Sequence, residues 1–205
     1  MGKKRIVKDS MGTMEVDESA LYGAQTQRAI DNFPVSGRKM PEEFIRALLL
    51  IKKNAAAANE KLGCLDASVT NAIRQACDEL LSDTALMVNF PIDVFQTGSG
   101  TSSNMNANEV IANIATRIDG NAIDANDQVN FGQSSNDVIP TAIHVSARLA
   151  IEQSLKPGLL HLIDTIEEKA TSVAGFCKTG RTHLMDAMPV RMDQTLLGWA
   201  SQLRQ

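Results

Sequence analysis

Three short polar segments interrupt an otherwise apolar, helix-forming sequence, and each contains residues that could bind an anion. The first runs from Gln96 to Asn106 and places Ser99, Gly100 and Thr101 at the expected start of a helix. Free backbone N–H groups and the helix dipole favour an anion at such a position, and hydroxyl groups add further donors. The alternative for this segment is a helix cap preceded by a flexible glycine turn.

The second and third segments have the same polar character. The second precedes another expected helix and contains Ser134, Ser135 and Asn136. These residues could cap that helix, or they could donate to the same anion as the first segment. In the third segment, Thr182 lies beside His183, within a stretch (178–188) that we expect to be a connecting loop. Because a histidine titrates near neutral pH, His183 could transfer a proton in either direction.

Composition and motifs exclude several functional classes. The net charge of −4 does not favour a nucleic-acid partner. No apolar stretch approaches the roughly 20 residues of a membrane span, so no membrane association is expected. No metal-ligand spacing, phosphate-binding loop or dinucleotide fingerprint is present, so we expect no metal and no cofactor. The basic start, Met1 to Arg5, is not followed by an apolar segment, so no secretory signal is expected.

The cysteines indicate the compartment. Cys64, Cys77 and Cys177 are widely spaced and odd in number, which is atypical of a disulfide framework. Cys77 also lies on an apolar helical stripe, as expected for a reduced core thiol. We therefore expect a cytoplasmic protein, with an organelle matrix as the alternative.

Helices are expected to position the three polar segments, because apolar residues recur with the 3.6-residue period and few segments resemble strands. The predicted helices span residues 42–62, 67–81, 102–119, 135–149, 157–166 and 194–205. Polar, loop-forming residues between Gly120 and Gln133 suggest a domain break there. The last helix has no stop signal after Leu203, which suggests a truncated chain, a natural C-terminal helix being the alternative. The predicted fold class is all-α.

Taken together, these segments resemble the aspartase/fumarase superfamily, and the match is close to the class II fumarases. The matching blocks are Tyr22–Arg28, Asn32–Pro34, Gly98–Glu109, Ser134–Asp137 and Gly180–Leu184. They occur in the family's order and cover nearly the whole chain. The resemblance implies reversible hydration of fumarate to (S)-malate by a homotetramer, each active site being built from three subunits. It also implies an N-terminal, mainly helical domain over residues 1–133 and the start of a central helical bundle over residues 134–205.

The resemblance assigns roles to individual residues. His183 would be catalytic, and the dicarboxylate substrate would be bound by Ser99, Gly100, Thr101, Ser134, Ser135, Asn136 and Thr182. The family loop that supplies the catalytic serine is not found in this chain, so the fragment is expected to lack the base. Asn126 and Asp127 match an accessory dicarboxylate site, but Asp124 replaces the family's histidine there. An acid would disfavour a bound dicarboxylate, so we expect this accessory site to be impaired.

Two alternatives remain. Aspartate ammonia-lyase shares the same frame, but it usually has glutamine at the position of His183 and Gly-Ala-Gly-Thr at the position of Gly98–Thr101. Both differences favour fumarase, because an imidazole can relay the proton that a departing hydroxide requires. A non-catalytic helical interaction domain would also explain the helices and their caps without any active site.

Overall fold

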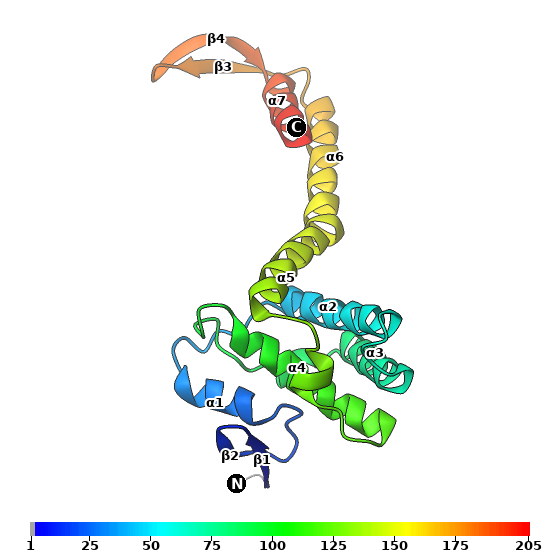
Figure 1. The fold of residues 1–205 in the computed structure, drawn as a ribbon. Helices are drawn as coiled ribbons and strands as arrows, with labels where there is room; N and C mark the ends of the chain where they lie inside the picture. Colours follow the sequence, from blue (N-terminus) through cyan, green and yellow to red (C-terminus); the bar gives the residue numbers. More distant parts are fainter. Residues whose placement is uncertain (1–2) are drawn as a thin grey trace. The chain divides into compact units, whose positions relative to one another are not determined.

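The computed structural model describes residues 3–205, so Met1 and Gly2 of the basic N-terminal run lie outside the described residues. The chain is mainly helical, which confirms the predicted class (Figure 1). The α-helices are α1 (Ala24–Asn32), α2 (Glu42–Lys61), α3 (Ala67–Ser82), α4 (Thr101–Asp119), α5 (Ser135–Ala150), α6 (Lys156–Ser172) and α7 (Met192–Arg204). Short helical turns are η1 (Leu86–Asn89), η2 (Ala125–Val129) and η3 (Ile151–Leu155). The strands are β1 (Lys4–Asp9), β2 (Gly12–Asp17), β3 (Cys177–Thr182) and β4 (Met185–Arg191).

The strands form two antiparallel hairpins, β1–β2 and β3–β4. The prediction of a connecting loop over residues 178–188 was therefore wrong, because most of this stretch belongs to β3 and β4. The register shifts between Thr179 and Arg181, which marks an irregularity in the pairing. Most side chains of β4 are exposed, so this hairpin lacks the alternation of apolar and polar residues by which a half-buried strand is recognised.

The described residues form two compact units, and the division between them falls within α5, between Ala147 and Arg148. The predicted division after residue 133 concerns the domains of the family and stays a prediction. None of the described helices is long and apolar enough to cross a membrane.

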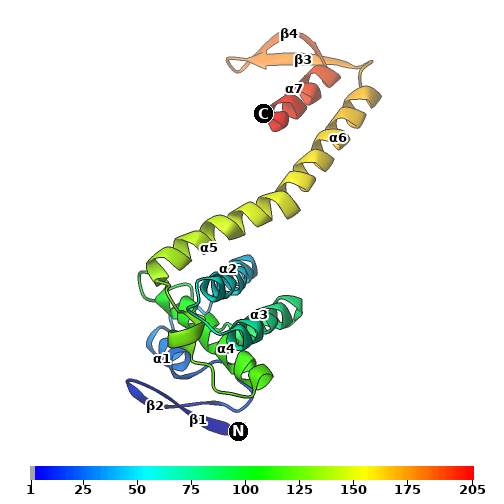
Figure 2. The same cartoon turned by 45° about the vertical axis from the view of Figure 1, so that its right-hand side comes forward.

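The core of the first unit lies between α2, α3 and α4, which pack side by side (Figures 1 and 2). Leu48, Ile73 and Ile111 come one from each helix, and all three are fully buried. Burying one such side chain contributes about 1.5–3 kcal/mol, so these stripes hold the three helices together. The predicted ends are confirmed: Gly63 and Gly120 follow α2 and α4 with positive φ, as helix-terminating glycines do.

In the second unit, α6 and α7 pack against each other and carry the β3–β4 hairpin. Ile163, Ala170 and Ala200 are buried between them. An ion pair joins Arg204 of α7 to Glu167 of α6 at 2.6 Å. Large apolar side chains nevertheless remain exposed on both helices, including Leu162 and Trp199.

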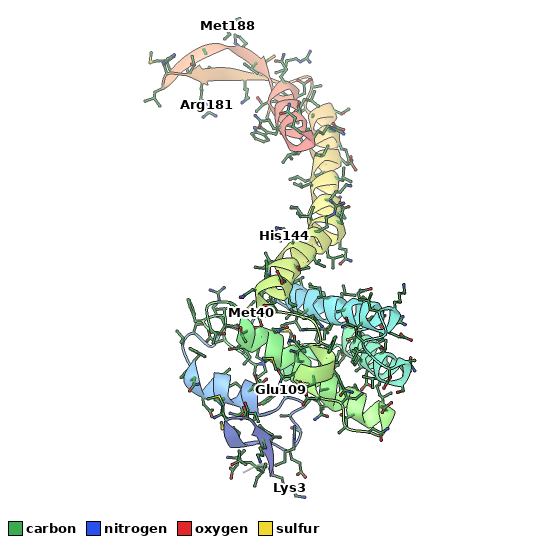
Figure 3. All side chains as sticks on the ribbon, viewed as in Figure 1. Lys3, Met40, Glu109, His144, Arg181 and Met188 are labelled. Carbon is green, nitrogen blue, oxygen red and sulfur yellow. The ribbon has the colours of Figure 1, made fainter. Side chains whose placement is uncertain are left out.

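A carboxylate on α4 anchors the N-terminal segment to the first unit. Glu109, labelled in Figure 3, accepts hydrogen bonds from the backbone N–H groups of Gly23, Gln25 and Thr26 at 2.9–3.1 Å, and from the Thr26 hydroxyl at 2.6 Å. These N–H groups lie at the start of α1, where no residue of the helix can accept from them. Glu109 thus caps α1 from a helix distant in sequence, and its negative charge is favourable at the positive end of the α1 dipole.

Replacing Glu109 by alanine is expected to lower the free energy of unfolding by about 2 kcal/mol, because it leaves several donors at the start of α1 without their charged acceptor. Urea unfolding followed by circular dichroism measures this loss. Glu79→Ala is the matched control, since the Glu79 side chain forms an exposed ion pair with Arg117 and such pairs contribute about 0–1 kcal/mol. Equal losses in the two variants would contradict the anchoring role of Glu109.

Candidate functional site

The first polar segment forms the start of α4. Gly100 adopts the left-handed conformation at the N-cap, with φ of 68°. The N–H of Ser102 donates to Thr97 Oγ1 at 3.3 Å, and the N–H of Ser103 donates to Gln96 Oε1 at 2.8 Å. Two of the backbone donors expected to face an anion are therefore capped by side chains that precede the helix.

The hydroxyl groups at this helix start remain as donors. Ser99 Oγ and Thr101 Oγ1 lie 2.7 Å apart, so one donates to the other and the second hydrogen is left for a ligand. Thr101 also lines a cavity of about 250 Å³, to which Arg28 contributes. The guanidinium of Arg28 is paired with Asp9 at 3.0 Å, which balances its charge. This region is thus rich in neutral donors.

The second polar segment forms the start of α5 and lies beside the first. Ser134 Oγ accepts from the N–H of Asn136 at 3.1 Å, so Ser134 also serves as a helix cap. Ser135 Oγ accepts from Asn104 Nδ2 of α4 at 3.0 Å. A Cβ atom at Gly100 would lie 3.1 Å from the side chain of Ile139 on α5, which shows how closely the two helix starts approach.

The third polar segment belongs to the second unit, in the β3–β4 hairpin. Thr182 ends β3 and pairs with Met185, so His183 and Leu184 form a two-residue turn between the strands. Both turn residues have positive φ, 49° and 60°, which is the pattern of a type I′ turn. His183 and Thr182 are exposed within the described chain. That all three segments share one site stays a prediction.

The two residues of the expected accessory site, Asn126 and Asp127, lie in η2. Their backbone N–H groups both donate to Asp124 Oδ1, at 2.7 and 2.8 Å. The acid that replaces the family's histidine therefore caps this turn and occupies donors that an anion would otherwise use. Whether the accessory site binds a dicarboxylate stays a prediction.

A buried lysine beneath the donor segments was not singled out by the motifs. Lys52 of α2 is fully buried, and its Nζ donates to Asn130 Oδ1 at 2.8 Å and to Gln133 Oε1 at 2.9 Å. No carboxylate within the described residues forms an ion pair with it. The sequence does contain a signal, because Lys52 follows Leu48 by four residues and so falls on the apolar stripe of its helix.

Burial lowers the pKa of Lys52 from an ordinary value of 10.5 to about 7. Between these values the unfolded chain binds more protons than the folded chain, so folding becomes more favourable as pH rises. We therefore expect wild type to gain stability relative to Lys52→Met as pH rises from about 7 to about 10. Urea unfolding at several pH values measures the difference.

The neighbouring variant Lys53→Met is the control for this titration, because Lys53 lies on the same helix but is less buried and forms an ion pair with the exposed Asp78 of α3. A stability difference between wild type and Lys52→Met that stays constant across this pH range would contradict the prediction.

Comparisons with known proteins place the chain in a family. It matches the family model described as "Lyase" over residues 12–205. Fumarate hydratase class II 2 of Pseudomonas aeruginosa is 60% identical over 205 residues, covering 100% of this chain and 44% of that protein. Fumarate hydratase class II of Xylella fastidiosa is 52% identical over 199 residues, covering 97% of this chain and 42% of that protein. The crystal structure of recombinant class II fumarase from Schistosoma mansoni has a TM-score of 0.93 at 40% identity, and the match covers 99% of this chain and 44% of that chain.

These matches confirm the resemblance that the polar segments indicated. The chain spans less than half the length of the relatives that it matches, 44% and 42%. The chain belongs to the lyase family, and its sequence is similar to the N-terminal part of the class II fumarate hydratases.

Proposed function

We propose that the protein containing this chain catalyses the reversible hydration of fumarate to (S)-malate. The observation that carries this proposal is the close approach of the starts of α4 and α5, joined by the 3.0 Å hydrogen bond between Asn104 and Ser135. It gathers hydroxyl and amide donors from two separate segments in one place. The 60% identity to a protein named fumarate hydratase class II 2 supports a dicarboxylate as the anion that these donors would bind.

The donors would act on the substrate carboxylates. When a proton leaves C3 of malate, negative charge develops on the adjacent carboxylate, and fixed donors there lower the barrier. The proposed donors, carried over from the family, are Ser99, Thr101, Ser134, Ser135, Asn136 and Thr182. The base that removes the C3 proton would be the serine of a family loop that this sequence does not contain.

His183 would transfer the second proton of the reaction, the one exchanged with the C2 hydroxyl group. The hydroxyl group on C2 leaves as water once it receives a proton, and in the hydration direction the water must lose that proton. An imidazole can do both near neutral pH. A homotetramer is part of the proposal, because in the family each active site combines segments from three subunits. Exposed apolar residues on α6 and α7, such as Leu162 and Trp199, support an interface in the second unit.

The test is turnover by the full-length protein, with fumarate formation followed from malate and from aspartate in separate assays. Turnover of malate is the expected result. Turnover of aspartate alone would overturn the hydratase proposal in favour of an ammonia-lyase. Turnover of neither substrate would favour the helical interaction domain. We also propose a cytoplasmic location, which fractionation of the source cells would check.

A further inference from the structure

A chain of hydrogen bonds connects the buried lysine of α2 to a proposed substrate-binding serine. Lys52 Nζ and Asn104 Nδ2 both donate to Asn130 Oδ1, at 2.8 and 3.2 Å. The same Asn104 nitrogen donates to Ser135 Oγ at 3.0 Å. Lys52 and Asn104 are 0% and 1% exposed, so water does not compete for these contacts. Ser135 is half-buried and stands where this chain of bonds reaches the surface.

The direction of each bond in this chain is set by the one before it. A protonated lysine can only donate, so Asn130 must turn its amide oxygen toward Lys52. The amide nitrogen of Asn130 then donates to the backbone oxygen of Gln133 at 3.1 Å, which holds the same orientation. Asn104 must consequently present its nitrogen to Asn130 Oδ1, and its second N–H points at Ser135.

This orientation is maintained at a cost. The amide oxygen of Asn104 is buried and has no hydrogen-bond partner within residues 3–205. A buried acceptor without a partner costs about 1–3 kcal/mol, yet turning the amide over would bring its oxygen against Asn130 Oδ1. The donors therefore decide the orientation. Loss of the lysine proton does not reverse it, because a neutral amine keeps two N–H groups for its two acceptors, Asn130 and Gln133.

The last bond decides what Ser135 can do. A serine oxygen that accepts from Asn104 must direct its own hydrogen elsewhere. Within the described residues the Ser135 hydroxyl donates to no other group, so its hydrogen is available to a ligand. A hydroxyl held as a donor matches a carboxylate, which can only accept.

We propose that Asn104 is a positioning residue, oriented by Lys52 through Asn130, which holds the Ser135 hydroxyl as a donor to a substrate carboxylate. The proposal rests on the proposed function for the identity of the ligand, a small dicarboxylate. It assigns to Asn104 no contact with the substrate, because the amide acts only through Ser135.

A double-mutant cycle in the full-length protein tests this coupling. The variants are Asn104→Ala, Ser135→Ala and the double variant, with the KM for malate and the dissociation constant of succinate as readouts. Asn104→Ala is expected to raise both constants about five- to tenfold, as loss of one hydrogen bond would. In the Ser135→Ala background, Asn104→Ala is expected to alter both constants less than about twofold, because Asn104 then has no Ser135 hydroxyl to position.

Asn106→Ala is the matched control. Asn106 lies on the same helix and is also 1% exposed, but its Nδ2 donates to the backbone oxygen of Asn89 at 3.0 Å, away from Ser135. Its effect should be the same in both Ser135 backgrounds. Lys52→Met, which keeps the length of the side chain, provides a second variant if Asn104→Ala does not fold, and its effect should likewise depend on Ser135.

The outcomes separate this proposal from the proposed function. If malate is turned over but the effects of Asn104→Ala and Ser135→Ala simply multiply, the positioning role is overturned and the hydratase stands. If only aspartate is turned over, the hydratase fails, and the same cycle with the KM for aspartate still decides the positioning role. A wild-type protein that binds no dicarboxylate would overturn both.

Discussion

Replacing His183 by asparagine is expected to lower kcat for malate dehydration by the full-length protein about 10²- to 10⁴-fold, the range of general acid–base catalysis. The imidazole would deliver the proton with which the C2 hydroxyl leaves as water, and an amide cannot supply it near neutral pH. The KM should change far less, because the proposed donors to the carboxylates are hydroxyl and amide groups elsewhere. Steady-state kinetics of purified protein measures both constants.

The backbone conformation at position 183 can accommodate asparagine. His183 has φ of 49° in a two-residue turn. Asparagine tolerates positive φ better than histidine does and is preferred in type I′ turns. The β3–β4 hairpin should therefore remain folded in the variant, so that a loss of kcat reports on the imidazole.

The control applies the same substitution to His161, an exposed residue of α6. His161→Asn should leave kcat unchanged. A full retention of kcat in His183→Asn would contradict the catalytic role of His183.

The helices α2 and α4 could be predicted from the sequence because each has an apolar stripe and is followed by a glycine with positive φ. In α2, Leu48 and Leu49 lie on the buried face and Gly63 follows the last turn. The β3–β4 hairpin carried neither signal. Its strands are largely exposed, and its turn is made of His183 and Leu184 instead of the asparagine or glycine that usually marks a type I′ turn. A turn of this composition can be recognised only once the two strands are paired.

The candidate site could be predicted in part for a related reason. Polar residues that interrupt apolar segments are visible in the sequence, and they made Ser135 and Thr101 candidates for the site. The residues proposed to orient Ser135 are not, since Lys52 and Asn130 are 78 positions apart and meet only in the folded unit. The capping of Ser102 by Thr97 was equally hidden, because a helix start shows its expected donors but not the side chains that occupy them.

A tightly packed glycine in β3, Gly180, leads to a second prediction with a large effect on kcat. A Cβ atom at Gly180 would lie 2.6 Å from the backbone oxygen of Met188 and 3.1 Å from Val190 Cγ2. The first contact is with backbone, which cannot move without changing the pairing of β3 with β4. Gly180 also lies within the register shift between Thr179 and Arg181, where the two strands are already irregular.

Gly180→Ala is therefore expected to distort the hairpin and displace His183, lowering kcat about 10²-fold, which is the cost that a misplacement of about 1 Å can have. Gly175→Ala, just before the same strand, is the control because a Cβ atom there meets nothing within 4 Å. Both variants add one methyl group, but only Gly180→Ala adds it where the paired strand leaves no room. If Gly180→Ala retained wild-type kcat, the added methyl group would not displace the imidazole, and the expected coupling between the β3–β4 pairing and catalysis would be wrong.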